Sequence, residues 1–290
     1  DYLPKPFEPT LLCARIASSL EKKHLRNLQH LYLKGLEREL DIAREIQLGF
    51  LPSDLPRPDG WEVAAYLKAA REVAGDFYDA FLLPDANLAF VVGDVCGKGV
   101  GAALFMTLFR SLIRITATTD AFSTSKEVQS FTPTDRLQHI VSFTNNYVSG
   151  THAAANMFAT VFIGIVDLQT GMLNYINCGN ESPLLLRNGS VVACLPPTGP
   201  VIGIILDAKY TVQSIQLERD DLLLAFTDGI PDAIDAQNTS FGSERLYHAL
   251  NGQNATSELI LNLVEDSLSR FIGTTDQFDD ITLMAIKRCV

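Results

Sequence analysis

The chain has 290 residues, 47% of them hydrophobic, which is enough to bury a sizeable core in one or two domains. Its formal net charge of -11, without any basic block, argues against a nucleic-acid partner. Five scattered cysteines and five histidines form neither a Cys-x-x-Cys pair nor a His-Glu-x-x-His pattern, which argues against a disulfide framework and a zinc site and favours the cytoplasm. We also expect no membrane span and no signal peptide, because no apolar run approaches about 20 residues.

Residues 1–52 differ from the rest of the chain and contain a predicted long helix. A helical seam with 3-4 spacing, with charges between its members, is formed by Leu33, Leu36, Leu40, Ala43, Gln47 and Phe50. One interpretation is a helix packed on its own domain; the other is a helix that pairs two protomers into a homodimer or relays a signal. Gly35 and the polar Gln47 weaken a regular coiled coil, so both interpretations stay open.

The rest of the chain predicts strands in runs, with separate helical blocks. We expect strands at 62–70, 77–83, 88–92, 157–166, 172–177, 184–186, 191–195, 210–217, 222–226 and 281–286. We expect a buried helix at 99–115, a loop at 118–130, a helix from an N-cap at Thr132 to 148, and a helix at 256–271. Adjacent strands joined by hairpin turns indicate an α+β fold with antiparallel sheets.

Four aspartates share a similar local setting. Asp76, Asp94 and Asp228 each adjoin a glycine at the edge of an apolar run, and Asp279 stands just before the last predicted strand. Carboxylates at strand ends, where glycine lets the backbone approach closely, provide the hard oxygen ligands that Mg²⁺ and Mn²⁺ prefer. A single such aspartate is more often a simple turn residue. Four of them together favour a metal centre, and two ions would suit phosphoryl transfer.

These aspartates lie in four segments that carry a family resemblance. In chain order they are Ala74-Gly75-Asp76-Phe77-Tyr78-Asp79, Gly93-Asp94-Val95-Cys96-Gly97-Lys98-Gly99-Val100-Gly101-Ala102-Ala103-Leu104, Phe226-Thr227-Asp228-Gly229-Ile230 and Asp279-Asp280-Ile281-Thr282. The ordered set resembles the bacterial branch of the PPM metal-dependent Ser/Thr phosphatases, the sporulation stage II protein E type, over about residues 37–287.

The resemblance implies a PPM-type sandwich of two antiparallel β-sheets flanked by helices, with two Mn²⁺ or Mg²⁺ ions at one edge. It implies that Asp94 bridges both ions and that the Val95 carbonyl ligates one of them. Asp228 and Asp279 would ligate the other ion, and Asp76 would hold metal-bound water or a metal directly. All four aspartates are therefore the expected catalytic residues.

Some neighbouring positions are less clear or depart from the family pattern. Asp280 is a candidate neighbour of the site, and Lys98 is either an accessory charge near the phosphate or a solvated lysine. Asn180 replaces a common His, Asn156 replaces a common acid, and Cys96 replaces a usual Ser. No metal-ligand position is lost, so we expect catalysis to be retained, but the departures put a third metal and the leaving-group proton donor in doubt.

The N-terminus carries a second resemblance, to the end of a response-regulator receiver domain. It rests on Asp1-Tyr2-Leu3-Pro4-Lys5-Pro6-Phe7-Glu8-Pro9 and the helical segment after it. We therefore expect a receiver remnant at 1–20, a helical linker at 21–52 and a phosphatase domain at 53–290, within a longer protein that includes a receiver domain and acts downstream of a histidine kinase. A coincidental proline-rich tail is the alternative.

Together these patterns predict a protein serine/threonine phosphatase whose activated water attacks a phosphoserine or phosphothreonine. By resemblance, the expected substrate is a phosphorylated STAS-domain protein, an anti-sigma-factor antagonist in a partner-switching pathway. One alternative is a phosphatase-like binding module that sequesters a partner. Another is the hydrolysis of a small phosphomonoester.

Overall fold

The computed structural model describes residues 8–119 and 132–289, which form two compact units, Asp1–Ile46 and Gln47–Val290. The first unit consists of most of helix α1 (Pro9–Leu48), which runs without a break across the expected boundary at residue 20. Residues 1–7, which carry the resemblance to a receiver domain and include Lys5, lie outside the described residues. The receiver remnant and the linker boundaries therefore stay predictions.

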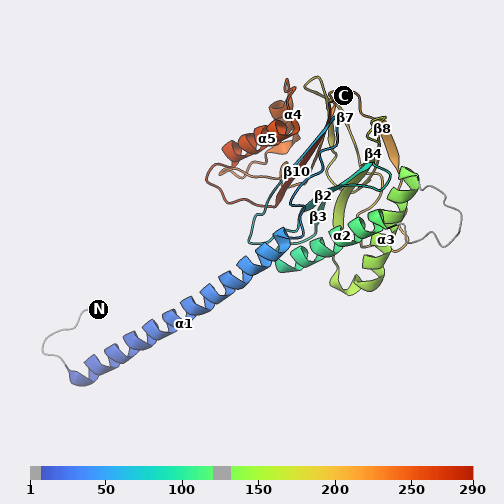
Figure 1. Ribbon diagram of the computed structural model, residues 1–290. Helices are drawn as coiled ribbons and strands as arrows, with labels where there is room; N and C mark the ends of the chain where they lie inside the picture. The colour runs from blue at the N-terminus through green and yellow to red at the C-terminus, as the bar shows by residue number, and fades with distance from the viewer. Residues whose placement is uncertain (1–7, 120–131, 290) are drawn as a thin grey trace. The chain divides into compact units, whose positions relative to one another are not determined.

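The second unit is a sandwich of two five-stranded antiparallel sheets, which confirms the predicted fold class (Figure 1). One sheet has the order β1-β10-β9-β6-β7, made of β1 (Trp61–Lys68), β10 (Ile281–Arg288), β9 (Leu222–Phe226), β6 (Leu184–Arg187) and β7 (Ser190–Cys194). The other has the order β2-β3-β4-β5-β8, made of β2 (Phe77–Leu82), β3 (Leu88–Val95), β4 (Ala159–Val166), β5 (Met172–Cys178) and β8 (Gln213–Gln216).

Three apolar layers hold the sandwich together. Phe90, Phe162 and Met284 belong to the layer between the sheets. Helices α2 (Val100–Thr118) and α3 (Pro133–Thr151) cover the sheet that contains β3, and α4 (Gly242–Leu250) and α5 (Ser257–Ile272) cover the sheet that contains β9. Central strands are thus buried on both faces, which explains why β3 and β9 read as continuous apolar runs rather than as alternating patterns.

Helix α2 is the one described helix whose length and composition would also suit a membrane span. Its buried side chains include Met106, Phe109 and Ile113, which belong to the core layer between the helices and the sheet. These contacts make α2 a core helix of the sandwich. The expected loop between α2 and α3 falls largely on residues 120–131, outside the described residues.

The structure corrects two element predictions. Helix α4 was not predicted, because its nine residues are fewer than the about 10–12 over which a helix can be recognised from apolar periodicity. Strand β8 is shorter than the predicted 210–217, because it pairs with β5 only from Gln213 to Gln216. The helix start at Thr132 is confirmed, with a capping box between Thr132 and Asp135.

A buried ion cluster joins β2 to α2. The Asp79 carboxylate is fully buried and lies 2.7 Å from Arg114 Nη1 and 2.9 Å from Arg110 Nη2. Removing one partner of a buried pair leaves an uncompensated charge, which typically costs about 3–5 kcal/mol.

We therefore expect Asp79→Ala to lower the free energy of unfolding by about 3 kcal/mol or more, measured by urea denaturation followed by circular dichroism. Asp85→Ala is the matched control, since the Asp85 carboxylate is partly exposed and 4.0 Å from Arg136, and its loss should cost less than about 1 kcal/mol. Equal unfolding midpoints for both variants would contradict this assignment.

Candidate active site

The fold brings Asp76 and Asp94 together at the end of β2 and β3. Phe77 and Gly93 are cross-strand partners, so the next pair outward along the ladder is Asp76 and Asp94. Their carboxyl groups share a hydrogen bond. Two of the predicted site residues are thus neighbours, although 18 positions separate them in the sequence.

Thr227 connects this pair to the opposite sheet. It follows β9, and its hydroxyl donates a 2.7 Å hydrogen bond to Asp76 Oδ2 while accepting a 3.0 Å bond from the Thr282 backbone N–H. Asp76 is almost completely buried at this junction, with 1% of its surface exposed. No role was predicted for Thr227 from the sequence. Its position directly before Asp228 was the one feature that could have pointed to it.

Asp228 lies just after β9 and Asp280 directly before β10, its neighbour in the sheet. A Cβ atom added to Gly229 would lie only 1.8 Å from the Asp280 carbonyl oxygen, so only glycine permits this close approach. Asp280 Oδ1 accepts a 2.7 Å bond from the Ala70 N–H, and Oδ2 accepts a 2.6 Å bond from the Gly75 N–H. Asp280 therefore fixes the segment that leads into Asp76.

Asp279 is paired with Lys98. Lys98 Nζ lies 2.9 Å from Asp279 Oδ2 and donates a 2.6 Å hydrogen bond to the Phe278 carbonyl. The other oxygen of Asp279 accepts a 2.9 Å bond from the Asp280 N–H. Lys98 thus neutralises one predicted metal ligand in this structure and is neither isolated nor simply solvated.

Electrostatic repulsion and burial dominate the site. Burial, followed by the charge of Asp228, raises the pKa of Asp94 to about 7. Burial, then the charge of Asp94, raises the pKa of Asp76, and burial, then the charge of Asp279, raises that of Asp228. The charge of Lys98 lowers the pKa of Asp228 and so opposes this shift. The carboxylates outnumber this cation, so the group has an excess of negative charge.

This donor set fits divalent cations in its chemistry, because it consists of hard oxygen ligands with unrelieved negative charge. The Val95 carbonyl lies beside Gly75, where an added Cβ would be 2.9 Å from its oxygen. Within residues 8–119 and 132–289, however, no three Asp, Glu, His or Cys side chains form a ready-made metal group. Metal ligation by Asp76, Asp94, Val95, Asp228 and Asp279 stays a prediction.

Two further carboxylates extend the acidic region, and the sequence analysis missed both. Burial raises the pKa of Glu181, with further contributions from the charges of Asp228 and Asp232. These two carboxylates are Glu181 and Asp232, and neither lies next to a glycine at a strand end as Asp76, Asp94 and Asp228 do. Asp232 is four positions after Asp228.

Asn180, which stands where the family often has a histidine, has a structural role. Its Nδ2 donates to the Phe226 carbonyl at 2.9 Å and to the Glu181 carbonyl at 3.0 Å. The side chain is buried and links the turn after β5 to the end of β9. Because its amide hydrogens are used in this way, Asn180 does not act as a free proton donor here.

Gln47 is the one buried side chain of helix α1. Its Nε2 donates to the Ala74 carbonyl at 2.6 Å, and its Oε1 accepts from the Ala74 N–H at 2.9 Å. From its polarity, Gln47 was expected to weaken a regular coiled coil. The structure shows that it holds the backbone two residues before Asp76.

Thr227→Val removes the hydrogen bond to Asp76 while nearly preserving side-chain volume. Because partners that orient a ligand typically contribute about 10–100-fold to metal affinity, we expect at least an approximately tenfold loss of Mn²⁺ affinity, measured by isothermal titration calorimetry. Thr227→Ser should restore it. Thr107→Val is the control, since it also removes a hydroxyl, which bonds to Ala103 within α2. Unchanged Mn²⁺ affinity in Thr227→Val would refute the orienting role.

Comparison with known proteins agrees with the fold and the motifs. The family model described as Stage II sporulation protein E (SpoIIE) matches residues 84–289. Protein IcfG of Synechocystis sp. is 37% identical over 273 residues, which cover 88% of this chain but 42% of IcfG. The phosphoserine phosphatase RsbU of Bacillus subtilis is 23% identical over 269 residues, which cover 90% of this chain and 75% of RsbU.

Solved structures show the same architecture. The SiaA-PP2C domain of Pseudomonas aeruginosa superimposes with a TM-score of 0.69 at 24% identity, covering 88% of this chain and 97% of that domain. The RsbU and RsbW domains of Rv1364c from Mycobacterium tuberculosis give a TM-score of 0.62 at 27% identity, covering 81% of this chain and 63% of that one. The chain therefore belongs to the SpoIIE family of PPM-type (PP2C) serine/threonine phosphatase domains.

Proposed function

We propose that the chain hydrolyses phosphoserine or phosphothreonine in a protein substrate, with two Mn²⁺ or Mg²⁺ ions as cofactors. The observation that carries this proposal is the meeting of Asp76 and Asp94 from one sheet with Asp228 from the other, in an acidic group with few cations. Such a group is costly to bury unless positive charge is supplied to it.

In this proposal Asp94, Asp76, Asp228, Asp279 and the Val95 carbonyl would hold the ions. Bound divalent ions supply Lewis-acid polarisation of the phosphoryl oxygens and a water with a lowered pKa. The protein's own contribution is orientation. The Asp76 and Asp94 carboxyl groups are close to each other, and the charge of Asp94, after burial, raises the pKa of Asp76.

Other residues keep this arrangement fixed. Thr227 holds the Asp76 carboxylate through its hydroxyl. Asp280 holds the preceding backbone at Ala70 and Gly75, and Lys98 keeps Asp279 in place by an ion pair. These restraints reduce the reorganisation that substrate binding would otherwise require.

We further propose that the substrate is a phosphorylated STAS-domain protein in a partner-switching pathway. The support comes from relatives: RsbU of B. subtilis is named a phosphoserine phosphatase, and one matching structure joins RsbU and RsbW domains in one chain. A further fold neighbour, RsbX, was crystallised with magnesium, which agrees with a divalent cofactor. The chain spans less than half of IcfG, so the activity of a longer protein is part of the proposal.

The linker helix would carry an upstream signal from a receiver domain, itself phosphorylated by a histidine kinase, and would pair two protomers. The contact that supports this is made by Gln47 in the last turn of α1, whose amide binds both backbone groups of Ala74. A shift of this turn would move the backbone directly before Gly75 and Asp76.

A second candidate function is a binding module that sequesters a partner without hydrolysis. The observation in its favour is that Lys98 already neutralises Asp279, and that the described carboxylates form no ready-made group of three. The two candidates differ in whether phosphate is released.

Asp94→Ala and Asp228→Ala should each lower Mn²⁺-dependent turnover of p-nitrophenyl phosphate and of phosphorylated STAS-domain proteins by about 1,000-fold, because each removes a charge that metal chemistry needs. Phosphate release is measured across a Mn²⁺ titration. Asp266→Asn, an exposed change on α5, is the control and should retain wild-type activity. A wild-type protein that binds the phosphoproteins but releases no phosphate would favour the binding module instead.

Deleting residues 1–36 should change the affinity for Mn²⁺ and the basal turnover by about fivefold or more, if the linker is coupled to the Asp76 segment. The compact unit that begins at Gln47 is retained in this variant. Titration calorimetry and steady-state assays provide the two readouts. Identical affinity and turnover in the full chain and the truncated chain would rule out coupling through the linker.

A further inference from the structure

Strand β1 is an edge strand with unpaired backbone groups. The Cys289 N–H donates to the Gly60 carbonyl at 2.7 Å. Gly60 and Cys289, the next pair beyond Trp61 and Arg288, therefore form a hydrogen-bonded pair of the β1–β10 ladder. The backbone N–H of Arg288 points away from β1 and donates to the Asp221 carbonyl. Since consecutive residues of an antiparallel ladder alternate in direction, the N–H and C=O groups of Val63 and Ala65 point away from β10.

The chain's own preceding segment does not fill this edge. Residues 51–58 run beside β1, but among the described strands none pairs with its outer side, and the segment bonds to it only through Pro58 and Trp61. Pro52, Pro56 and Pro58 lack the N–H groups that a sixth strand would need. The backbone donors and acceptors of Val63 and Ala65 consequently stay open.

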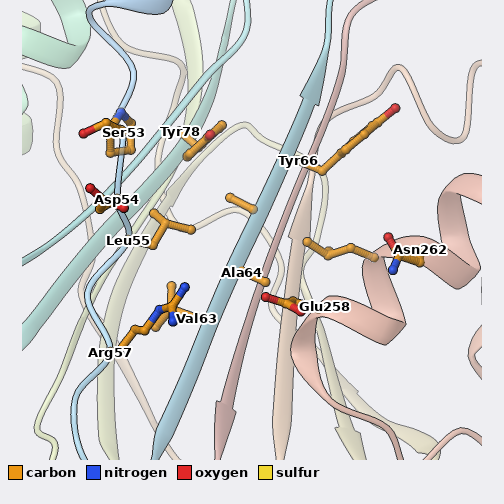
Figure 2. A pocket seen from close by; sticks show the side chains of 13 residues that line it. Ser53, Asp54, Leu55, Arg57, Val63, Ala64, Tyr66, Tyr78, Glu258 and Asn262 are labelled. Atoms are coloured by element: carbon orange, nitrogen blue, oxygen red, sulfur yellow. The ribbon is translucent and has the colours of Figure 1, made fainter.

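A groove follows this edge. A cavity of about 400 Å³ is lined by residues 52–57 on one side, by Val63 to Tyr66 on the strand, and by Glu258 and Asn262 of α5 on the other side. Figure 2 shows the labelled side chains from Ser53 to Arg57 beside the strand and those of α5 across it. A second cavity of about 290 Å³ shares Arg57, Val63, Ala64 and Glu258 with the first, so the two are neighbours along β1.

The groove is separate from the acidic site and has an acidic rim of its own. None of the candidate metal ligands lines either cavity. Asp54, Glu62 and Glu258 border the groove, against the single basic side chain of Arg57. This balance, together with the net charge of -11, favours a positively charged occupant.

We propose that this groove binds an extended basic peptide segment of a partner protein, which adds to β1 as a sixth strand of the sheet. The backbone groups of Val63 and Ala65 supply the pairing, as in other cases of strand addition. The acidic rim selects Lys or Arg side chains on the occupant. The proposal is independent of phosphatase activity and assigns a docking site away from the carboxylates.

The first test uses fluorescein-labelled, end-capped hexapeptides and the full chain, with binding followed by fluorescence anisotropy. The alternating Val-Lys peptide should bind saturably. The same peptide with N-methyl groups on alternate residues loses its backbone donors but keeps its charge, and should bind at least about tenfold more weakly. An alternating Val-Glu peptide should not bind. Equal affinity for the methylated and unmethylated peptides would overturn strand addition.

The second test uses variants of the groove. Ala65→Pro removes an outward N–H without breaking a bond to β10, and edge positions tolerate proline in this orientation, so circular dichroism should show a folded protein. Its affinity for the Val-Lys peptide should fall by about tenfold or more, as should that of Glu258→Lys. Glu244→Lys makes the same charge change on α4, away from the groove, and is the control.

Two outcomes would overturn the proposal. The first is equal weakening by Glu244→Lys and Glu258→Lys, which would indicate general charge attraction. The second is a dimer in sedimentation velocity that dissociates in Ala65→Pro and competes with the peptide, which would make a second copy of the chain the occupant. If Ala65→Pro fails to fold, Glu258→Lys and the methylated peptide still decide between the outcomes.

Discussion

The hydrogen bond between the Thr227 hydroxyl and the Asp76 carboxylate joins the two sheets at the point where the acidic residues meet. It is 2.7 Å long, is buried, and connects groups that are 151 positions apart in the sequence. Thr227 is itself held by the backbone of Thr282 on β10. Through this chain of contacts, the central strands of one sheet position a carboxylate that belongs to the other, so the site depends on the correct packing of the sandwich as a whole.

Collecting carboxylates at this junction works against folding. Burial raises the pKa of Asp76, Asp94 and Asp280, and in each case desolvation is the largest cause. The fold offsets part of this cost with backbone donors, as at Asp280, and with an ion pair at Asp279. An uncompensated desolvation cost of this kind is usual at sites whose arrangement is set by function rather than by stability. The three apolar layers of the sandwich contribute favourable burial free energy, which offsets the unfavourable contribution of the site.

The sequence predicted those features that depend on local patterns. Asp94 and Asp228 could be singled out as candidates because each lies at a strand end next to a glycine. The α+β class with antiparallel sheets followed from strand runs joined by turns, whereas the sandwich was implied by the family resemblance. The contact of Gln47 with Ala74 was not predicted, because the two residues are 27 positions apart and nothing in a helical pattern reveals such a contact. Glu181 and the role of Thr227 were missed for the same reason. Helix α4 was missed because its nine residues are too short a stretch for helical periodicity to be recognised.

The segment between β1 and β2 is where these long-range contacts converge. It has no regular secondary structure of its own, yet Ala70 and Gly75 are held by Asp280, and Ala74 by Gln47. The Gly75 carbonyl also accepts a 3.4 Å bond from the Val95 N–H, just beyond Asp94. Its position directly before Asp76 brings contacts from the helix end, the last strand and β3 together beside the acidic site. This convergence is the physical basis for the proposed coupling of the linker to that site.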